Sequence, residues 1–229
     1  MKNFYLSIAT RTCMRPGFLK DNIESVKSQS DNDIEQVFIV DRSKKGIQWA
    51  DRALHENRKR MNGEWSFILD DDCWLTDTEF VSKLRLFTKE NPQANLIMFR
   101  SKRPKGPPSD QTVFPTREVW GKMPKHQTTN CLCYAIRTPI WKQHILHFGT
   151  HDWGGDWHFL EAVLKAGHKP FWMEGPPIAE SRQLGRGKLF EPAQPGWFER
   201  VATQEGLADL GKDDWRLQLW KDCECGNAK

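Results

Sequence analysis

Three consecutive aspartates, Asp70, Asp71 and Asp72, directly follow the apolar stretch Trp65 to Leu69. Neighbouring carboxylates repel one another, so a run of this kind indicates that something cationic binds it. Hard oxygen ligands at the carboxyl end of a buried strand suit Mg²⁺ or Mn²⁺, and such an ion usually accompanies a phosphate group. The run therefore predicts a site for a divalent metal and a nucleotide.

The first half of the chain alternates short apolar runs with amphipathic stretches, which is typical of strands joined by crossover helices in a mostly parallel sheet. We expect strands over Phe4 to Ala9, Gln36 to Asp41, Ser66 to Asp70 and Asn95 to Phe99, and helices over Phe18 to Gln29, Ile47 to Met61 and Thr78 to Glu90. In such doubly wound sheets, ligands bind outside the carboxyl ends of the strands. Thr10, Arg11 and Asp41 are therefore expected to face the same crevice as the aspartate run.

The organisation changes near residue 100, where the basic, proline-rich stretch Arg100 to Pro108 predicts a loop. Four elements are expected after it: a strand over Asn130 to Ile136, a short helix after Pro139, a helix over Phe159 to Ala166 and a strand over Pro170 to Met173. Beyond Glu180, Gly, Pro and charged residues dominate until Trp215 to Trp220, whose spacing fits a closing helix. We expect one domain over residues 1–229.

The composition is that of an ordinary globular protein, with 229 residues and 38% hydrophobic residues, enough for a substantial core. The N-terminal apolar stretch is too short for a signal peptide, and no run approaches the roughly 18 apolar residues of a membrane span. A cytoplasmic location is therefore expected, and the six cysteines are expected to be reduced thiols. The net charge of +4 is equally consistent with solubility or with an anionic partner.

From about Leu6 to Ser181 the chain resembles the family 2-like glycosyltransferases with the GT-A fold. The resemblance rests on four segments in family-like order: Ile23 to Gln29, Glu35 to Ser43, Asn57 with Met61 to Asp72, and Gly154 to Asp156 followed by Leu160 and Gly167. It implies an α/β fold in which a Rossmann-like, mostly parallel central sheet is flanked by helices, with a smaller acceptor-side half. Residues 1–99 would bind the nucleotide sugar, residues 100–182 the acceptor, and residues 183–229 would form a C-terminal lid and tail.

The resemblance implies an inverting transfer of sugar from a nucleoside-diphosphate sugar, expected to be a UDP-sugar, to an acceptor hydroxyl. Asp72 would hold Mn²⁺ or Mg²⁺ against the leaving diphosphate, and Asp70 would lie nearer to the ribose and the metal-bound waters. Thr10, Arg11 and Asp41 would line the nucleoside pocket. Asp71 would belong to the same donor site as the member of the run that tolerates substitution best.

The acceptor hydroxyl must lose its proton as it attacks, so a carboxylate within hydrogen-bond reach is required. Asp156 is the candidate base, and a single base on the acceptor side implies inversion. Trp153 and Trp157 are candidate sugar platforms, and Asn130 is a further acceptor-side residue. Two alternatives remain: Asp156 is the N-cap of a helix that begins at Trp157, or the base is Asp152.

The chain lacks the histidine that many members of the family carry after the last strand. The segment that follows the strand contains Arg182, Arg186 and Lys188 instead, which could clamp the diphosphate as a mobile lid with glycine hinges. An ordinary basic surface loop is the alternative.

The sequence leaves the acceptor and the oligomeric state open. One class of acceptor is a saccharide or a lipid-linked sugar. The other is a hydroxymethylated base in DNA, with phosphate contacts from Arg100 to Lys105, Arg58 to Arg60, and Lys44 and Lys45. Two further alternatives are a nucleotidyltransferase and a non-catalytic sugar-nucleotide binder.

Overall fold

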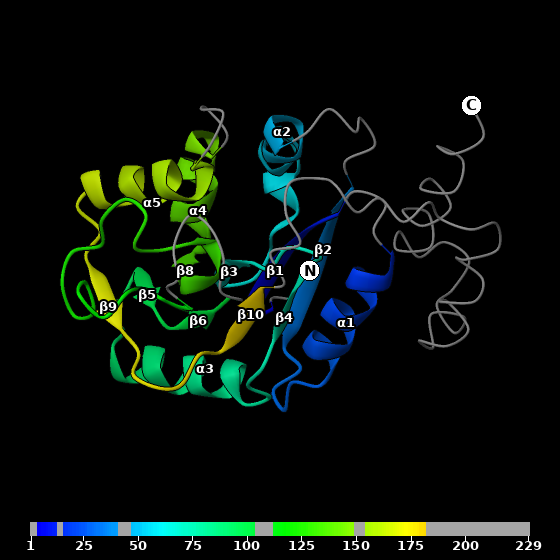
Figure 1. Ribbon diagram of the computed structural model, residues 1–229, viewed down its shortest axis with the longest axis horizontal. Coiled ribbons are helices and arrows are strands. Elements are labelled where there is room, and N and C mark those ends of the chain that lie inside the picture. The colour runs from blue at the N-terminus through cyan, green and yellow to red at the C-terminus, as the bar shows by residue number, and fades with distance from the viewer. Residues whose placement is uncertain (1–3, 13–15, 41–46, 104–111, 149–153, 182–229) are drawn as a thin grey trace.

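The computed structural model describes residues 4–12, 16–40, 47–103, 112–148 and 154–181, and these form two sheets with helices around them (Figure 1). The strands are β1 (Leu6–Thr12), β2 (Ile34–Val40), β3 (Trp65–Ile68), β4 (Cys73–Leu75), β5 (Leu96–Met98), β6 (Ser101–Lys102), β7 (Val113–Phe114), β8 (Tyr134–Arg137), β9 (Pro170–Trp172) and β10 (Ala179–Ser181). The α-helices are α1 (Pro16–Lys27), α2 (Ile47–Asn57), α3 (Phe80–Glu90), α4 (Thr138–His144) and α5 (Gly155–Lys165). Short 3-10 turns are η1 (Arg58–Arg60), η2 (Cys131–Cys133) and η3 (Ile145–His147).

The larger sheet has six strands in the order β2-β1-β3-β8-β5-β9. The strand β1 pairs in parallel with both β2 and β3, and β5 pairs in parallel with β9. Only β8, which is antiparallel to β3 and β5, runs in the opposite direction among these six strands. This confirms the expected mixed α/β fold with a central, mostly parallel sheet flanked by helices.

Helices cover both faces of the larger sheet. Figure 1 shows α1 and α3 on one side and α2, α4 and α5 on the other. Each side has its own apolar core: Phe80 of α3 belongs to the first, and Trp141 of α4 and Phe159 of α5 belong to the second. Neighbouring β1 residues Ile8 and Ala9 face the two different cores, so the strand is buried on both faces, as central parallel strands are.

The smaller sheet was not expected from the sequence. Its four strands lie in the order β4-β10-β6-β7, and β10 pairs antiparallel with β4 and parallel with β6. The prediction of a loop from Arg100 is wrong at Ser101 and Lys102, which form β6, while residues 104–111 lie outside the described ranges. Strands of two or three residues are too short to show alternation, and they exist here because distant strands pair with them.

Several element boundaries also differ from expectation. The second helix ends at Asn57 and continues as the 3-10 turn η1 instead of reaching Met61. The late helix α5 begins at Gly155, earlier than expected. The start of the expected strand after Asn130 is the turn η2, because the Asn130 side chain accepts a hydrogen bond from the Leu132 N–H and caps that turn.

Gly63 lies just before β3, where the chain passes close to β1. Its N–H donates to Ser7 Oγ at 2.6 Å and to Glu35 Oε1 at 3.1 Å. A Cβ atom built on Gly63 would lie 2.5 Å from the backbone nitrogen of Ser7, well inside van der Waals contact. Glycine is therefore required here for the close approach of two backbones.

None of the helices in the described ranges combines the length and the apolar character that a membrane crossing requires. Of the six cysteines, Cys73, Cys131 and Cys133 are described, and all three are free thiols, as expected.

Candidate active site

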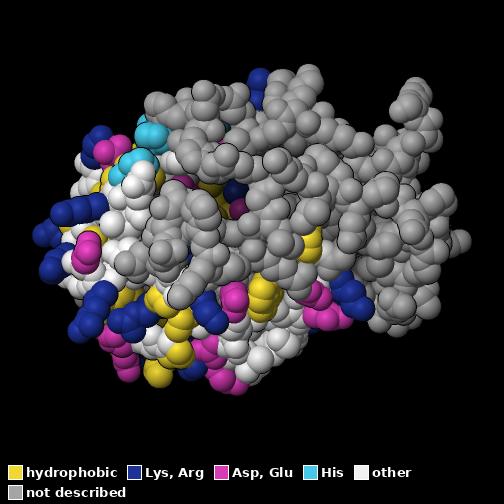
Figure 2. Space-filling model, viewed as in Figure 1, with side chains coloured by type: hydrophobic (Ala, Val, Ile, Leu, Met, Phe, Trp, Pro, Cys, Tyr) yellow, Lys and Arg dark blue, Asp and Glu magenta, His cyan; other side chains and the backbone are white. Residues whose placement is uncertain are grey.

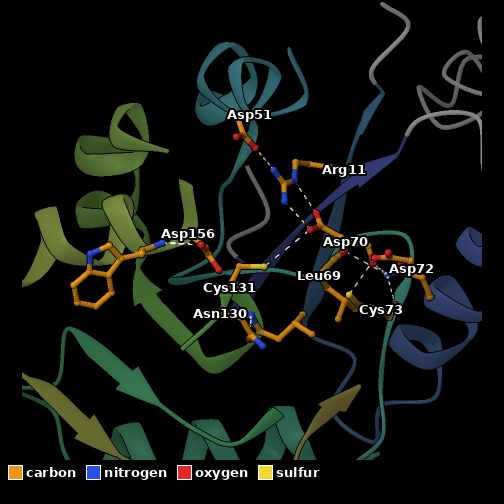
Figure 3. Close-up of polar contacts among 12 residues, drawn as sticks. Arg11, Asp51, Leu69, Asp70, Asp72, Cys73, Asn130, Cys131 and Asp156 are labelled. Carbon is orange, nitrogen blue, oxygen red and sulfur yellow. Dashed lines mark hydrogen bonds and ion pairs between the residues drawn. The ribbon is translucent and has the colours of Figure 1, made fainter. Parts of the chain in front are cut away.

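Arg11, near the carboxyl end of β1, is held between two carboxylates. Its Nε and Nη2 atoms donate to the two carboxylate oxygens of Asp70 at 2.7 Å and 2.6 Å. Its Nη1 atom pairs with Asp51 of α2, and the guanidinium carbon lies 4.9 Å from the centre of the Phe148 ring. Figure 3 shows Asp51 and Asp70 approaching Arg11 from opposite sides. Arg11 therefore links β1, the aspartate run and α2.

The three side chains of this cluster are largely buried. The exposed fractions of the side chains are 12% for Arg11, 3% for Asp51 and 20% for Asp70. Burial raises the pKa of Asp51 to about 6, although the Arg11 charge opposes the shift. For Arg11, burial alone lowers the pKa, but Asp70 and Asp51 outweigh it and the net shift is upward. The guanidinium is therefore a fixed positive charge.

Asn22 of α1 holds the turn that carries the aspartate run. The Asn22 side-chain amide donates to the carbonyl oxygens of Asp70 at 2.9 Å and Cys73 at 2.8 Å. The Gln36 amide of β2 in turn donates to Asn22 Oδ1 at 2.6 Å and to Thr10 Oγ1 at 2.9 Å. Thr10 is fully buried in this network, which places it beneath the site and not on its surface.

The three aspartates have different environments. Asp70 holds Arg11, whereas Asp71 is fully buried and its N–H donates to the Arg11 carbonyl oxygen at 3.1 Å. Asp72 is partly exposed, and its Oδ1 accepts a hydrogen bond from Cys73 Sγ at 3.4 Å. A fully buried carboxylate is the opposite of a tolerant surface position. The expectation that Asp71 tolerates substitution best is therefore not supported.

Asp156 lies in the first turn of α5, on the far side of Arg11 from Asp72 (Figure 3). Its Oδ1 accepts from the Trp157 N–H at 2.8 Å, and its carbonyl oxygen accepts from the Tyr134 hydroxyl at 3.0 Å. Burial raises the pKa of Asp156, while the Trp157 N–H and Arg11 oppose the shift. The N-cap is Gly154, with φ of +81°, so the alternative that Asp156 is the N-cap is wrong.

Asp156 belongs to the same electrostatic cluster as the aspartate run. The charges of Asp70 and Asp156 both raise the pKa of Asp51, and the charge of Asp70 also raises the pKa of Asp156. The positive charge of Arg11 opposes both shifts. Cys131 lies between these side chains, with its Sγ 4.0 Å from Asp70 Oδ2, and burial raises its thiol pKa. The predicted base Asp156 therefore lies in one electrostatic cluster with Arg11 and Asp70.

Two acceptor-side predictions, Trp157 and Asn130, lie within the described ranges. Trp157 is partly buried, and its ring centre lies 5.9 Å from that of His126. Asn130 has a structural role, because its Oδ1 accepts from the Leu132 N–H at 3.0 Å and from Ser101 Oγ at 3.2 Å. The other predicted residues lie outside the described ranges: Asp41, Trp153, Arg182 and Arg186, together with Asp152 and Lys188.

The aspartate run fits Mg²⁺ or Mn²⁺ only in part. Carboxylate oxygens at a strand end are the correct donor type, but both oxygens of Asp70 are engaged by Arg11. In the described parts of the chain, no group of three or more His, Cys, Asp or Glu side chains is arranged to hold a metal. Asp72 would therefore be the main protein ligand, and a bound phosphate would have to supply further oxygens.

Sequence reasoning missed Asp51 and Asn22. Asp51 is 2% exposed and lies one helical turn before the fully buried Leu54 on the same face of α2. An acid on the apolar face of an amphipathic helix requires a buried partner. The spacing of Asp51 and Leu54 therefore already predicted such a partner from the sequence. Asn22 shows no such signal, because its role depends on the distant turn after β3.

No family model matches the sequence, and no curated protein matches it. Among solved structures it is similar to S. aureus TarS, with a TM-score of 0.60 and 13% identity over 92% of this chain and 40% of that chain. TarS 1-349 in complex with UDP-GlcNAc gives a TM-score of 0.59 and 13% identity, covering 92% of this chain and 68% of that chain. The UDP complex gives 0.58 and 12%, covering 92% and 67%. The chain thus spans two fifths of the longer TarS structure, and the likeness shows a shared fold.

Proposed function

We propose that the protein is a glycosyltransferase that moves a sugar from a UDP-sugar to an acceptor hydroxyl with inversion at the anomeric carbon. One observation carries the proposal: a charged cluster lies at the carboxyl ends of β1 and β3 in a fold shared with a protein solved with UDP and UDP-GlcNAc. That edge is where doubly wound sheets bind nucleotides.

On the donor side, Asp72 is the residue that would hold Mg²⁺ or Mn²⁺. The ion would neutralise charge on the departing diphosphate, which stabilises the transition state. The turn that presents Asp72 is held rigid by Asn22, so the carboxylate has a defined position when the donor arrives.

On the acceptor side, Asp156 accepts the proton of the attacking hydroxyl. The acceptor oxygen forms a bond to the anomeric carbon as the bond from that carbon to the diphosphate oxygen breaks, and the nucleoside diphosphate leaves. A direct displacement of this kind inverts the anomeric centre. The raised pKa of Asp156, caused by burial, makes it a stronger base than an exposed aspartate.

Nucleotide binding is tested by thermal shift of the whole chain with UDP, UDP-GlcNAc, ADP and GDP, each with and without Mn²⁺. A ligand at 100 times its Kd adds about 2.7 kcal/mol of stability, which corresponds to a Tm increase of about 5 to 10 °C for a chain of this size. We expect the increase with the uridine nucleotides and Mn²⁺, with smaller effects from ADP and GDP. No shift with any nucleotide sugar would overturn the proposal.

A hydroxymethylated base in DNA is a second candidate acceptor, and the charge distribution favours it. Residues 100–182 contain twelve Lys and Arg against seven Asp and Glu, whereas residues 1–99 contain fifteen of each. The excess positive charge therefore lies in the half that carries Asp156. In Figure 2, Lys and Arg side chains gather along the edge of the molecule where β9 lies.

The DNA candidate predicts binding to duplex DNA at low salt that weakens steeply as salt rises, because bound phosphates release counterions. A gel shift between about 50 and 200 mM salt measures this, with a neutral oligosaccharide as competitor. Absence of binding at the lowest salt would exclude DNA and leave a saccharide as the acceptor.

A further inference from the structure

We propose that an aromatic surface beside Asp156 binds an unpaired nucleic-acid strand, with bases stacked on its rings and phosphates on the lysines around it. The rings of this aromatic surface are those of Trp120, His126, Trp157 and Trp172. Binding of the strand is independent of the proposed function, whereas transfer of a sugar to one of its bases rests on it.

The aromatic surface consists of two ring pairs, and each pair has one ring from residues 116–128. Trp120 lies against Trp172 of β9, with 4.8 Å between the ring centres. His126 lies against Trp157 of α5, with 5.9 Å between the ring centres. Trp120 and His126 are six positions apart in the sequence, so their Cα atoms lie at most about 22 Å from each other. Both pairs are therefore within reach of one short strand.

The rings are held in place and still reach solvent. The tryptophans of α5 and β9 pack with one side against the second core. Both remain partly exposed, as Trp120 does, and His126 is exposed. The guanidinium carbon of Arg100 lies 3.9 Å from the centre of the Trp120 ring, and Trp120 Nε1 donates to Glu174. Rings that are already fixed lose little conformational freedom when a ligand stacks on them.

The backbone of residues 116–128 is closed on itself. The Thr116 N–H donates to the Thr128 carbonyl oxygen at 3.0 Å, and Thr128 Oγ1 accepts from the Lys125 N–H at 3.0 Å. Gln127, directly after His126, has φ of +64°, a left-handed conformation that costs energy in a residue with a Cβ atom. Conformations of this kind are concentrated at active sites and ligand clamps. The strained position of Gln127 therefore supports a binding role for the neighbouring ring.

The charge around the aromatic surface favours a phosphate backbone over a neutral saccharide. Residues 116–128 and 165–174 contain five Lys and Arg against two Asp and Glu. All five basic side chains are exposed: Arg117, Lys122, Lys125, Lys165 and Lys169. Lys and Arg side chains line the edge of the molecule where β9 lies (Figure 2). Aromatic rings that stack bases, together with basic side chains that contact phosphates, are the usual means of binding single strands.

The rings also require that the bases be unpaired. In a duplex the faces of the bases are stacked on one another, so aromatic side chains reach only bases that have left the stack. Asp156 lies in the first turn of α5, next to Trp157, and a base that reacts there must be free of its helix. A single strand should therefore bind more tightly than a duplex.

Fluorescence anisotropy of the full chain tests the proposal with three labelled probes. They are a single strand of about 20 nucleotides, the duplex of the same sequence, and an abasic strand that keeps the phosphates and lacks the bases. Wild type should bind the single strand at least about tenfold more tightly than either of the others, because only that probe offers free base faces.

A first set of variants tests the stacking. Trp120→Leu should weaken binding of the single strand by about 5- to 100-fold and change binding of the abasic strand by less than about twofold. Trp120→Phe keeps an aromatic ring and should resemble wild type. Circular dichroism checks that each variant is folded, and the comparison of the three probes on wild type needs no variant.

A second set of variants tests the phosphate contacts. Lys122→Gln/Lys125→Gln should reduce the slope of log affinity against log salt by about 2, since each lysine that contacts a phosphate contributes about one unit. The matched control is Lys83→Gln/Lys89→Gln on α3, which covers the opposite side of the larger sheet (Figure 1). Its slope should equal that of wild type.

Three results would overturn the proposal: equal affinity of wild type for the single strand and the abasic strand, equal losses on both strands in folded Trp120→Leu, or displacement of the strand by maltoheptaose at similar concentration. The last result would assign the rings to a saccharide. Failure of the proposed function looks different, because uridine nucleotides would then not bind while the strand would bind without any nucleotide.

Discussion

Replacing Asp156 by asparagine should lower turnover by about 10² to 10⁴-fold, the range that general base catalysis supplies, while UDP binding stays within about twofold. The amide has the shape of the carboxylate and can still accept the Trp157 N–H, and the Tyr134 hydroxyl bonds to the backbone, so α5 keeps its start. Only the ability to take a proton is lost. Steady-state kinetics together with UDP titration measure the two quantities separately.

The matched control is Glu161→Gln, which makes the same chemical change further along α5, where Glu161 pairs with Lys165. Its turnover should equal that of wild type. In wild type, turnover should also fall as the pH falls through the raised pKa of Asp156, because the protonated acid cannot act as a base. Unchanged turnover in Asp156→Asn would remove this residue from the mechanism and make Asp152 the candidate to test next.

Replacing Gly63 by alanine should destabilise the fold by about 3 kcal/mol, which is a Tm decrease of about 10 °C. The added methyl group would lie 2.5 Å from the Ser7 nitrogen and 2.8 Å from the Leu6 carbonyl carbon, both backbone atoms of β1. Backbone atoms in a central strand cannot move away as the end of a side chain can. Thermal unfolding followed by circular dichroism measures the loss.

Gly121→Ala is the control for the backbone effect alone. Gly121 has φ of +74°, and an added Cβ would meet no atom within 4 Å. The substitution should cost only the strain of a left-handed alanine, about 1 kcal/mol. Equal losses in Gly63→Ala and Gly121→Ala would show that the contact with β1 relaxes freely and that Gly63 is not required for close packing.

Most of the larger sheet could be predicted because its strands lie in short apolar runs that alternate along the chain with amphipathic helices. The helix α3 was expected from its apolar spacing, and it buries Phe80, Val81 and Leu84 as that spacing requires. The smaller sheet could not be predicted, since β6 and β7 have two residues each and exist through pairing with one another and with β10.

The candidate site, too, could be predicted from the sequence only in part. The positions of Arg11, Asp70 and Asp156 followed from strand ends and from a glycine pair before a helix. The contact between Arg11 and Asp51 could not be predicted, because it joins residues 40 positions apart that meet only where α2 approaches β1. The turn geometry also places the three aspartates, Asp70, Asp71 and Asp72, in different environments. Three identical residues in a row do not predict that geometry.

The register of β10 has a consequence for how the chain acquires its fold during synthesis. Ser181 lies opposite Cys73, the residue directly after the aspartate run, so the two partners are separated by about a hundred residues. The same strand pairs with β6 on its other side. A nascent chain can therefore assemble β1, β2 and β3 early, but the far side of the aspartate turn stays without a partner until β10 has been made. Contacts of such long separation slow folding, and the smaller sheet should be the last part of the described fold to form.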